Sequence, residues 1–172
     1  MDNMNNLNNT NDDILNINSQ NINVYCLNKK FWNLLYNNKI INIHINNVLI
    51  PFGIEKFNDK IVLNIELLDS NDNNNIISKL ESIENQIEKY FKNHGLSKSL
   101  KKSKLGYILR THYMKSTECY ILKKNGEKMM IDENNLQNAE CEFNLLIKGI
   151  WINENNYGLY IIINSIKINK FN

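Results

Sequence analysis

Apolar and polar residues alternate along most of this chain, which is the pattern of strands that bury one face. The alternation predicts strands near residues 22–26, 41–52, 61–67, 105–114, 119–124, 127–131, 141–151 and 159–168. Asn125-Gly126 lies between two of these segments and predicts a tight hairpin turn. One dense apolar cluster, Phe31–Tyr36, lacks the alternation, and we expect it to form one or two helical turns.

A single segment has a clear helical period. Its apolar residues recur at spacings of three and four, at Ile76, Leu80, Ile83 and Ile87. The spacing predicts one amphipathic α-helix over about 73–93, with N-cap candidates at 72–74 and a C-terminal stop at Gly95. Because the apolar stripe covers one face only, we expect this helix to pack against a sheet.

Six or seven of these strands around one helix, without a strand–helix–strand rhythm, predict a mainly β fold, a small antiparallel barrel with additional strands. Residues 1–20 are mostly Asn, Asp, Ser and Gln and cannot bury enough apolar surface to become ordered. We therefore expect a disordered Asn-rich tail over 1–20 and one domain over 21–172. No stretch approaches the roughly 18 apolar residues of a membrane span, and no signal peptide is evident, so an intracellular location without membrane contact is expected.

The sequence offers no recognisable catalytic or metal-binding motif. The six glycines are too far apart for a phosphate-cradling loop, and the three histidines form no spaced ligand pairs with the three cysteines. Residues 69–80 resemble a calcium loop at their start, but Asn74 replaces the turn glycine and Leu80 the final glutamate. We therefore predict no cofactor, no metal and no enzymatic activity. An odd number of cysteines with no close pair indicates a reducing compartment.

Charge is unevenly distributed along the chain. The segment 89–124 contains ten basic residues and a single acidic one, Glu118, whereas the remainder contains ten basic and seventeen acidic residues. Such a concentration of positive charge is typical of a surface that binds a polyanion such as nucleic acid. The alternative is a Lys-rich loop produced by codon composition, since the chain has nineteen lysines and one arginine.

Aromatic residues are interleaved with this charge, and aromatic rings stack on unpaired bases at a gain of roughly 1–3 kcal/mol each. A duplex hides the faces of its bases, so the combination favours single strands. We predict nucleic-acid contacts by Lys98, Lys101, Lys102, Lys104, Tyr107, Arg110, Tyr113, Lys115, Tyr120, Lys123 and Lys124. For each single tyrosine, a half-buried core position is the alternative.

Several segments occur in an order similar to that of a known family. They are Val48–Glu55 with its Pro-Phe-Gly, Lys60–Glu66, the amphipathic helix, Ile108–Arg110, Lys148–Asn153 and Tyr157–Leu159. The order resembles the single-stranded-DNA-binding proteins of nucleocytoplasmic large DNA viruses, which are similar to those of short-tailed coliphages. The resemblance implies an OB-type barrel, a role in viral DNA replication and recombination, contacts with viral replication proteins, and a location in the host cytoplasm or at a viral replication site.

These observations together predict sequence-independent binding of single-stranded DNA. A virion structural or scaffold protein that contacts DNA or an acidic partner is the first alternative. A nucleic-acid-processing enzyme is the second, and the absence of clustered acidic metal ligands disfavours it. The sequence leaves the oligomeric state open, a homo-oligomer included.

Overall fold

The computed structural model describes residues 21–57, 60–132 and 136–171, so the tail predicted over 1–20 lies outside the described residues. The described chain is mainly β, with one α-helix, α2 (Asn71–Ile87), followed by a short 3-10 turn, η2 (Glu88–Tyr90). Its strands are β1 (Ile22–Asn28), β2 (Phe31–Tyr36), β3 (Ile41–Leu49), β4 (Ile54–Phe57), β5 (Lys60–Leu68), β6 (Gly95–Leu96), β7 (Leu100–Lys102), β8 (Gly106–His112), β9 (Glu118–Leu122), β10 (Lys128–Met130), β11 (Ala139–Ile152) and β12 (Asn156–Phe171).

Five of these strands close into a barrel. Hydrogen bonding runs from β3 to β5, β8 and β12, and β11 pairs with both β12 and β3, which completes the ring. All neighbours in the ring are antiparallel except β8 and β12, which meet in parallel at His112 and Ile162. This five-stranded ring with crossing connections is an OB-type barrel, which confirms the predicted fold class.

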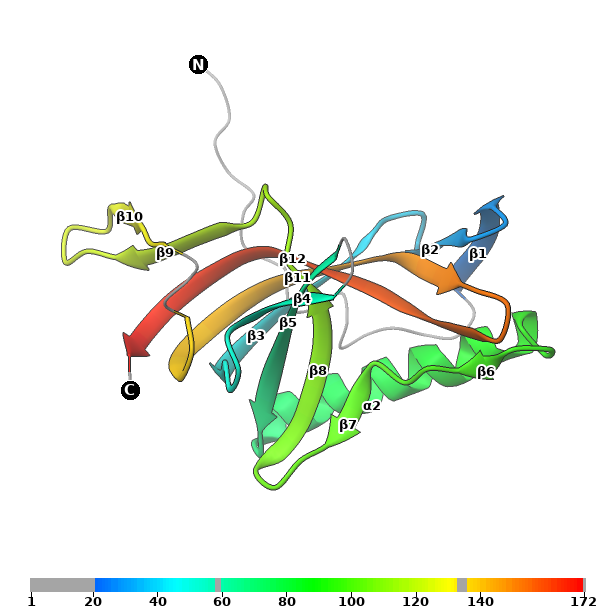
Figure 1. The fold of residues 1–172 in the computed structure, drawn as a ribbon, viewed down its shortest axis with the longest axis horizontal. Helices are drawn as coiled ribbons and strands as arrows, with labels where there is room; N and C mark the ends of the chain where they lie inside the picture. Colours follow the sequence, from blue (N-terminus) through cyan, green and yellow to red (C-terminus); the bar gives the residue numbers. More distant parts are fainter. Residues whose placement is uncertain (1–20, 58–59, 133–135, 172) are drawn as a thin grey trace, which may run out of the picture.

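Two hairpins extend the barrel at opposite ends of its long axis (Figure 1). The β1–β2 hairpin joins the far end of β11, where Trp32 and Phe31 pair with Ile150 and Trp151. The β9–β10 hairpin joins the other end of β12, and its turn contains the predicted Asn125-Gly126. The barrel therefore carries additional strands, as the sequence pattern predicts.

The helix buries one face, as predicted, but its ends differ from the prediction. Its buried apolar residues are Ile76, Ile77, Leu80, Ile83 and Ile87. Ser70 caps the N-terminus, because its side chain accepts a hydrogen bond from the Asn73 N–H at 3.2 Å. Gly95 does not end the helix but begins β6. No helix in the described ranges is long and apolar enough to cross a membrane.

The cluster over Phe31–Tyr36 forms strand β2, so the predicted helical turns are wrong. The strand has apolar residues on both faces, which hides the alternation in the sequence. Leu34 is completely buried, and Trp32 contacts Phe91 at 5.2 Å between ring centroids on the core side. Phe31 and Leu35 point to the opposite side of the sheet, where they line a groove.

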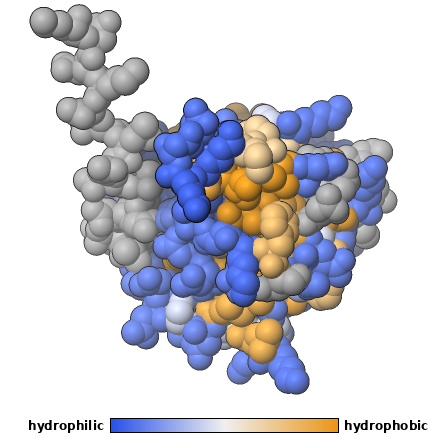
Figure 2. Space-filling model, turned by 90° about the vertical axis from the view of Figure 1, so that its left-hand side faces the viewer, coloured by the Kyte–Doolittle hydropathy of each residue, from blue (hydrophilic) through white to orange (hydrophobic). Residues whose placement is uncertain are grey.

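Large hydrophobic side chains are exposed at the end of the molecule that carries the β9–β10 hairpin. Leu122, Met129, Met130 and Phe171 are all between 40% and 60% exposed. Figure 2 views this end and shows hydrophobic side chains gathered among hydrophilic ones. None of the three cysteines, all within the described ranges, forms a disulfide; Cys26 lies at the surface and the other two are buried.

Gly149 allows the β1–β2 hairpin to approach β11 closely. A Cβ atom at this position would lie 2.3 Å from the backbone oxygen of Trp32 and 2.8 Å from the ring of Phe31. Both distances are shorter than any real Cβ contact, and one neighbour is backbone, which cannot rotate away. Gly149 therefore fixes how closely β2 packs on the end of β11.

We predict that Gly149→Ala destabilises the protein by about 2 kcal/mol or more, within or above the usual cost of overpacking. Chemical denaturation measures this change in the free energy of unfolding. Lys148→Ala is the matched control, since Lys148 is the exposed neighbour on the same strand. Equal stability of the Gly149→Ala variant and the control would contradict the close approach.

Candidate nucleic-acid interface

A shallow groove of about 510 Å³ lies on the outer face of the sheet, opposite the core. It forms where the β1–β2 hairpin, β11, β12 and the loop after β8 meet. Its lining includes Tyr25, Phe31, Asn33, Met114, Lys148 and Tyr160. Strand alternation explains this set, because the neighbours of these residues along β2 and β12, such as Leu34 and Ile161, point into the core.

Aromatic rings run across this face from β1 to β8. The rings of Phe31 and Tyr160 meet edge to face, with centroids 5.6 Å apart, and His112 lies 4.5 Å from Tyr160 at an interplanar angle of 34°. Tyr25 on β1 is 43% exposed, and Phe31, Tyr160 and His112 are each partly exposed. Partly exposed rings on a concave surface offer faces and edges on which unpaired bases stack.

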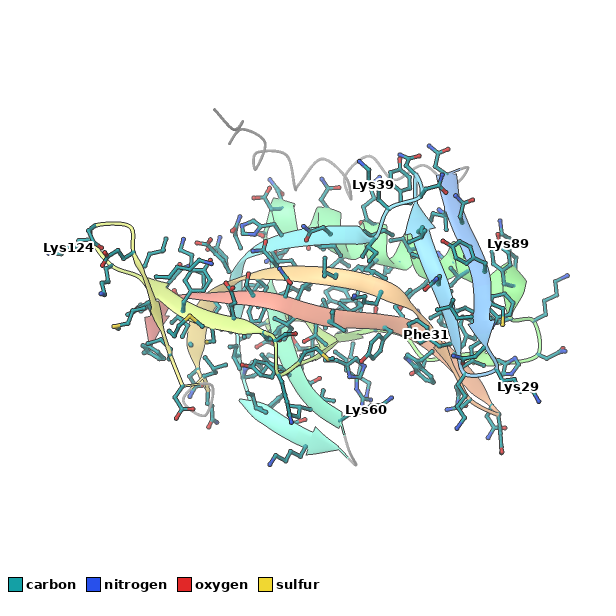
Figure 3. All side chains as sticks on the ribbon, turned by 90° about the horizontal axis from the view of Figure 1, so that it is seen from above. Lys29, Phe31, Lys39, Lys60, Lys89 and Lys124 are labelled. Atoms are coloured by element: carbon teal, nitrogen blue, oxygen red, sulfur yellow. The ribbon has the colours of Figure 1, made fainter. Side chains whose placement is uncertain are left out.

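Positive charge accompanies the rings. Lys148 lines the groove, and no acidic residue is among the lining residues. Burial lowers the pKa of His112 to about 4, and the nearby charges of Lys60 and Arg110 lower it further in the same direction. His112 is therefore neutral at pH 7, and its two cationic neighbours belong to the same face. Figure 3 shows Phe31 between Lys60 of the β4–β5 hairpin and Lys29 of the β1–β2 turn.

Two of the predicted aromatic residues, Tyr107 and Tyr113, lie on the side of the sheet that faces the core. Tyr113 is only 4% exposed and belongs to the core, so its predicted stacking role is wrong. Tyr107 on β8 is half-buried and packs against the core cluster, on the same side of the sheet as Tyr113. The sequence pattern grouped these two rings correctly, but their face is the one that the barrel buries. The opposite face of β8 carries Arg110 and His112 and contributes to the outer face of the sheet.

Tyr120 lies at the other end of the molecule, on strand β9. Its cross-strand neighbours are Lys167 on β12 and Met130 on β10, and the Lys128 ammonium lies 4.3 Å from its ring centroid. Lys123 and Lys124 occupy the turn at the tip of the same hairpin and are exposed. These three predicted residues therefore lie together, away from the groove.

The predicted basic segment does not form one surface. Four of its lysines are exposed but lie on either side of Ser99, the residue that ties this part of the chain to α2; they are Lys98, Lys101, Lys102 and Lys104. There the buried Glu84 carboxylate accepts hydrogen bonds from the Ser99 N–H and hydroxyl, both at 2.7 Å. Figure 3 shows Lys89 and Lys124 at opposite ends of the long axis. Lys115 lies in the sequence between Met114 and Ser116, which both line the groove, so it is the predicted lysine closest in sequence to this site.

The sequence analysis named as contacts none of the residues that line the groove, among them Tyr25, Phe31, Asn33, Lys148 and Tyr160. It also missed Lys60, whose charge acts on His112. One signal was present: β2 and the first half of β12 are apolar at both odd and even positions. In a barrel strand only one face meets the core, so apolar residues on the other face indicate a second contact. Which residues share that contact depends on strand pairing, which no local pattern shows.

Comparison with known proteins finds distant structural neighbours. No known family model and no curated protein matches the chain. The single-stranded DNA-binding protein from bacteriophage Enc34, in complex with single-stranded DNA, is 14% identical, and the match covers 88% of this chain and 96% of that chain with a TM-score of 0.49. Its C-terminal truncation is 13% identical, with coverage of 90% and 98% and a TM-score of 0.48.

These neighbours are too distant to transfer a function to this chain. Both are forms of a phage protein, so the resemblance to proteins of large DNA viruses stays a prediction. Any assignment of function depends on the groove itself.

We predict that His112 makes the protein less stable in acid. Its pKa is about 4 in the folded state and 6.5 ordinarily, so the unfolded chain binds the extra proton as the pH falls from 6.5 to 4. The free energy of unfolding is therefore highest above pH 6.5 and falls by roughly 1–3 kcal/mol as the pH is lowered from 6.5 to 4. Urea denaturation at several pH values, compared with His112→Phe, isolates this loss. A variant that declines as steeply as the wild type would contradict the assignment.

Proposed function

We propose that this chain binds single-stranded DNA along the outer face of its sheet, with little dependence on base sequence. The observation that carries the proposal is the groove itself, in which partly exposed rings, Phe31 and Tyr160 among them, lie beside Lys148 with no acidic residue in the lining. Stacking accepts any base, and lysine contacts phosphate without reading sequence. Both kinds of contact are therefore tolerant of sequence.

Single strands fit this surface better than duplexes do. The Tyr160 ring centroid lies 5.6 Å from that of Phe31 and 4.5 Å from that of His112, so the three rings form one continuous aromatic cluster. A base contacts such a cluster only when it is unstacked and unpaired, and each such contact contributes roughly 1–3 kcal/mol. We infer no catalytic step, since coating an exposed strand requires binding alone.

The setting that agrees best with such binding is viral DNA replication and recombination, in which exposed strands are coated. This part of the proposal comes from the sequence resemblance. Partners among viral replication proteins and a viral replication site in the host belong to the same proposal.

One observation favours the alternative, a structural or scaffold protein. The exposed hydrophobic side chains of Leu122, Met129 and Met130 belong to the β9–β10 hairpin and that of Phe171 to the end of β12, away from the groove. Large exposed hydrophobic side chains at one end of a molecule are typical of a protein contact. A scaffold protein would use this end and would have no need for the groove.

We predict that the protein prefers a single strand over a duplex of equal length. Fluorescence anisotropy with labelled oligothymidylate, duplex DNA and RNA measures the three affinities across salt. If about four phosphates are neutralised, log affinity falls against log salt with a slope near −3. Phe31→Ala should weaken binding roughly ten-fold and leave the slope unchanged, because stacking releases no ions.

Charge reversal separates the groove from the predicted basic segment. Lys60→Glu with Lys148→Glu should abolish binding, whereas Lys101→Glu with Lys102→Glu changes the net charge equally and should weaken it much less. Circular dichroism verifies that each variant is folded. Equal or tighter duplex binding, or stronger loss from the second pair, would overturn the assignment of the groove and favour the scaffold alternative.

A further inference from the structure

Three polar side chains in the groove have unused hydrogen-bonding capacity. Asn33, Ser116 and Lys148 all line it, and in the described part of the chain none of their side chains has a hydrogen bond or an ion pair. Asn144, by contrast, binds both His44 and Ser165 on the outer face, each at 2.9 Å. The three polar groups of the groove thus remain available to a ligand.

Asn33 has a specific place among the aromatic rings. It lies on β2 two residues from Phe31, on the same face, and its cross-strand neighbour on β1 is Tyr25. Its amide therefore projects between two rings into a groove whose other walls are mostly apolar. The side chain is half-exposed and makes no hydrogen bond within the described chain, so no internal bond has to break before a ligand binds. The amide is therefore available to a ligand that enters the groove.

The amide is suited to the edge of an unpaired base. Its carbonyl oxygen accepts and its NH₂ group donates, side by side. The Watson–Crick edge of each base also places a donor beside an acceptor, and proteins that bind single-stranded RNA hydrogen-bond these edges on splayed bases. Because an amide matches either order by turning over, it can hydrogen-bond any of the four bases. Hydrogen bonding of this kind agrees with binding that does not depend on sequence.

We propose that the groove is a subsite for one unpaired base, in which the Asn33 amide hydrogen-bonds the base edge and Lys148 contacts the adjoining phosphate. The volume of about 510 Å³ lies within the range of small-ligand sites and leaves room for the sugar. This inference rests on the proposed function and deepens it. It assigns the site a requirement for a hydrogen-bonding base, in addition to ring stacking.

An isosteric base without hydrogen-bonding groups tests this proposal. Anisotropy compares oligothymidylate with an oligomer of equal length in which difluorotoluene replaces every thymine. The wild type should bind oligothymidylate about five-fold more tightly. Asn33→Leu should bind both oligomers equally, and Asn75→Leu, at an exposed position on α2, should keep the five-fold difference. Lys148→Ala should weaken both oligomers by the same factor.

Thermal unfolding adds a readout that needs no ligand. Asn33→Leu should melt close to the wild-type temperature, because the half-exposed amide makes no hydrogen bond within the described chain. A lower melting temperature would indicate a structural role and overturn the proposal. So would a wild type that does not distinguish the two oligomers, or an Asn33→Leu variant that still does. If the wild type binds neither oligomer, the proposed function itself fails, which is a distinct result.

Discussion

The antiparallel pairing of β11 with β12 is the contact on which the rest of the structure depends. It runs from Ala139 opposite Phe171 to Ile152 opposite Tyr157, longer than any other pairing in the described chain. The end nearer Ala139 closes the barrel, because β11 also pairs there with β3. Three register shifts bend the two strands, as β-bulges do, so that they close the ring and still continue beyond it.

The candidate site forms because β11 and β12 continue beyond the barrel. Beyond the barrel, the free edge of β11 pairs with β2, and the β1–β2 hairpin continues the sheet at this end. Phe31 of the hairpin then meets Tyr160 of β12, and His112 of the barrel strand β8 lies on the other side of the same ring. The groove therefore combines an element added to the barrel with the barrel itself. Neither part alone has the continuous aromatic surface.

The sequence contained the local structure but not the long-range pairing. Period-two alternation, the helical stripe and Asn125-Gly126 specify elements through residues that are close in the chain, and these predictions are confirmed. The segment Phe31–Tyr36 was misread because a strand that contacts the core on one side and a groove on the other shows no alternation. Tyr113 was misplaced for a related reason, since alternation shows which residues share a face and leaves open which face is buried.

The basic segment illustrates the same limit for charge. Residues adjacent in sequence reach the helix side, the outer face and the hairpin tip, because β7, β8 and β9 have different neighbours in the sheet. Conversely, Lys148 comes from a region of ordinary charge and is brought to the groove by strand pairing. Lys60 comes close to His112 because β5 pairs with β8. A cluster of charge in the sequence becomes a surface patch only when the topology keeps its residues together.

The central claim is that a single strand occupies the outer-face groove and not the lysine-rich segment 98–104, which includes β7. Hydrogen–deuterium exchange of the full chain, with and without oligothymidylate, tests it most directly. We expect protection in peptides from β2, from the loop at 113–117 and from the end of β11 with the start of β12, and none in peptides covering 97–105. Protection confined to 97–105, with unchanged exchange around Phe31 and Tyr160, would contradict the account.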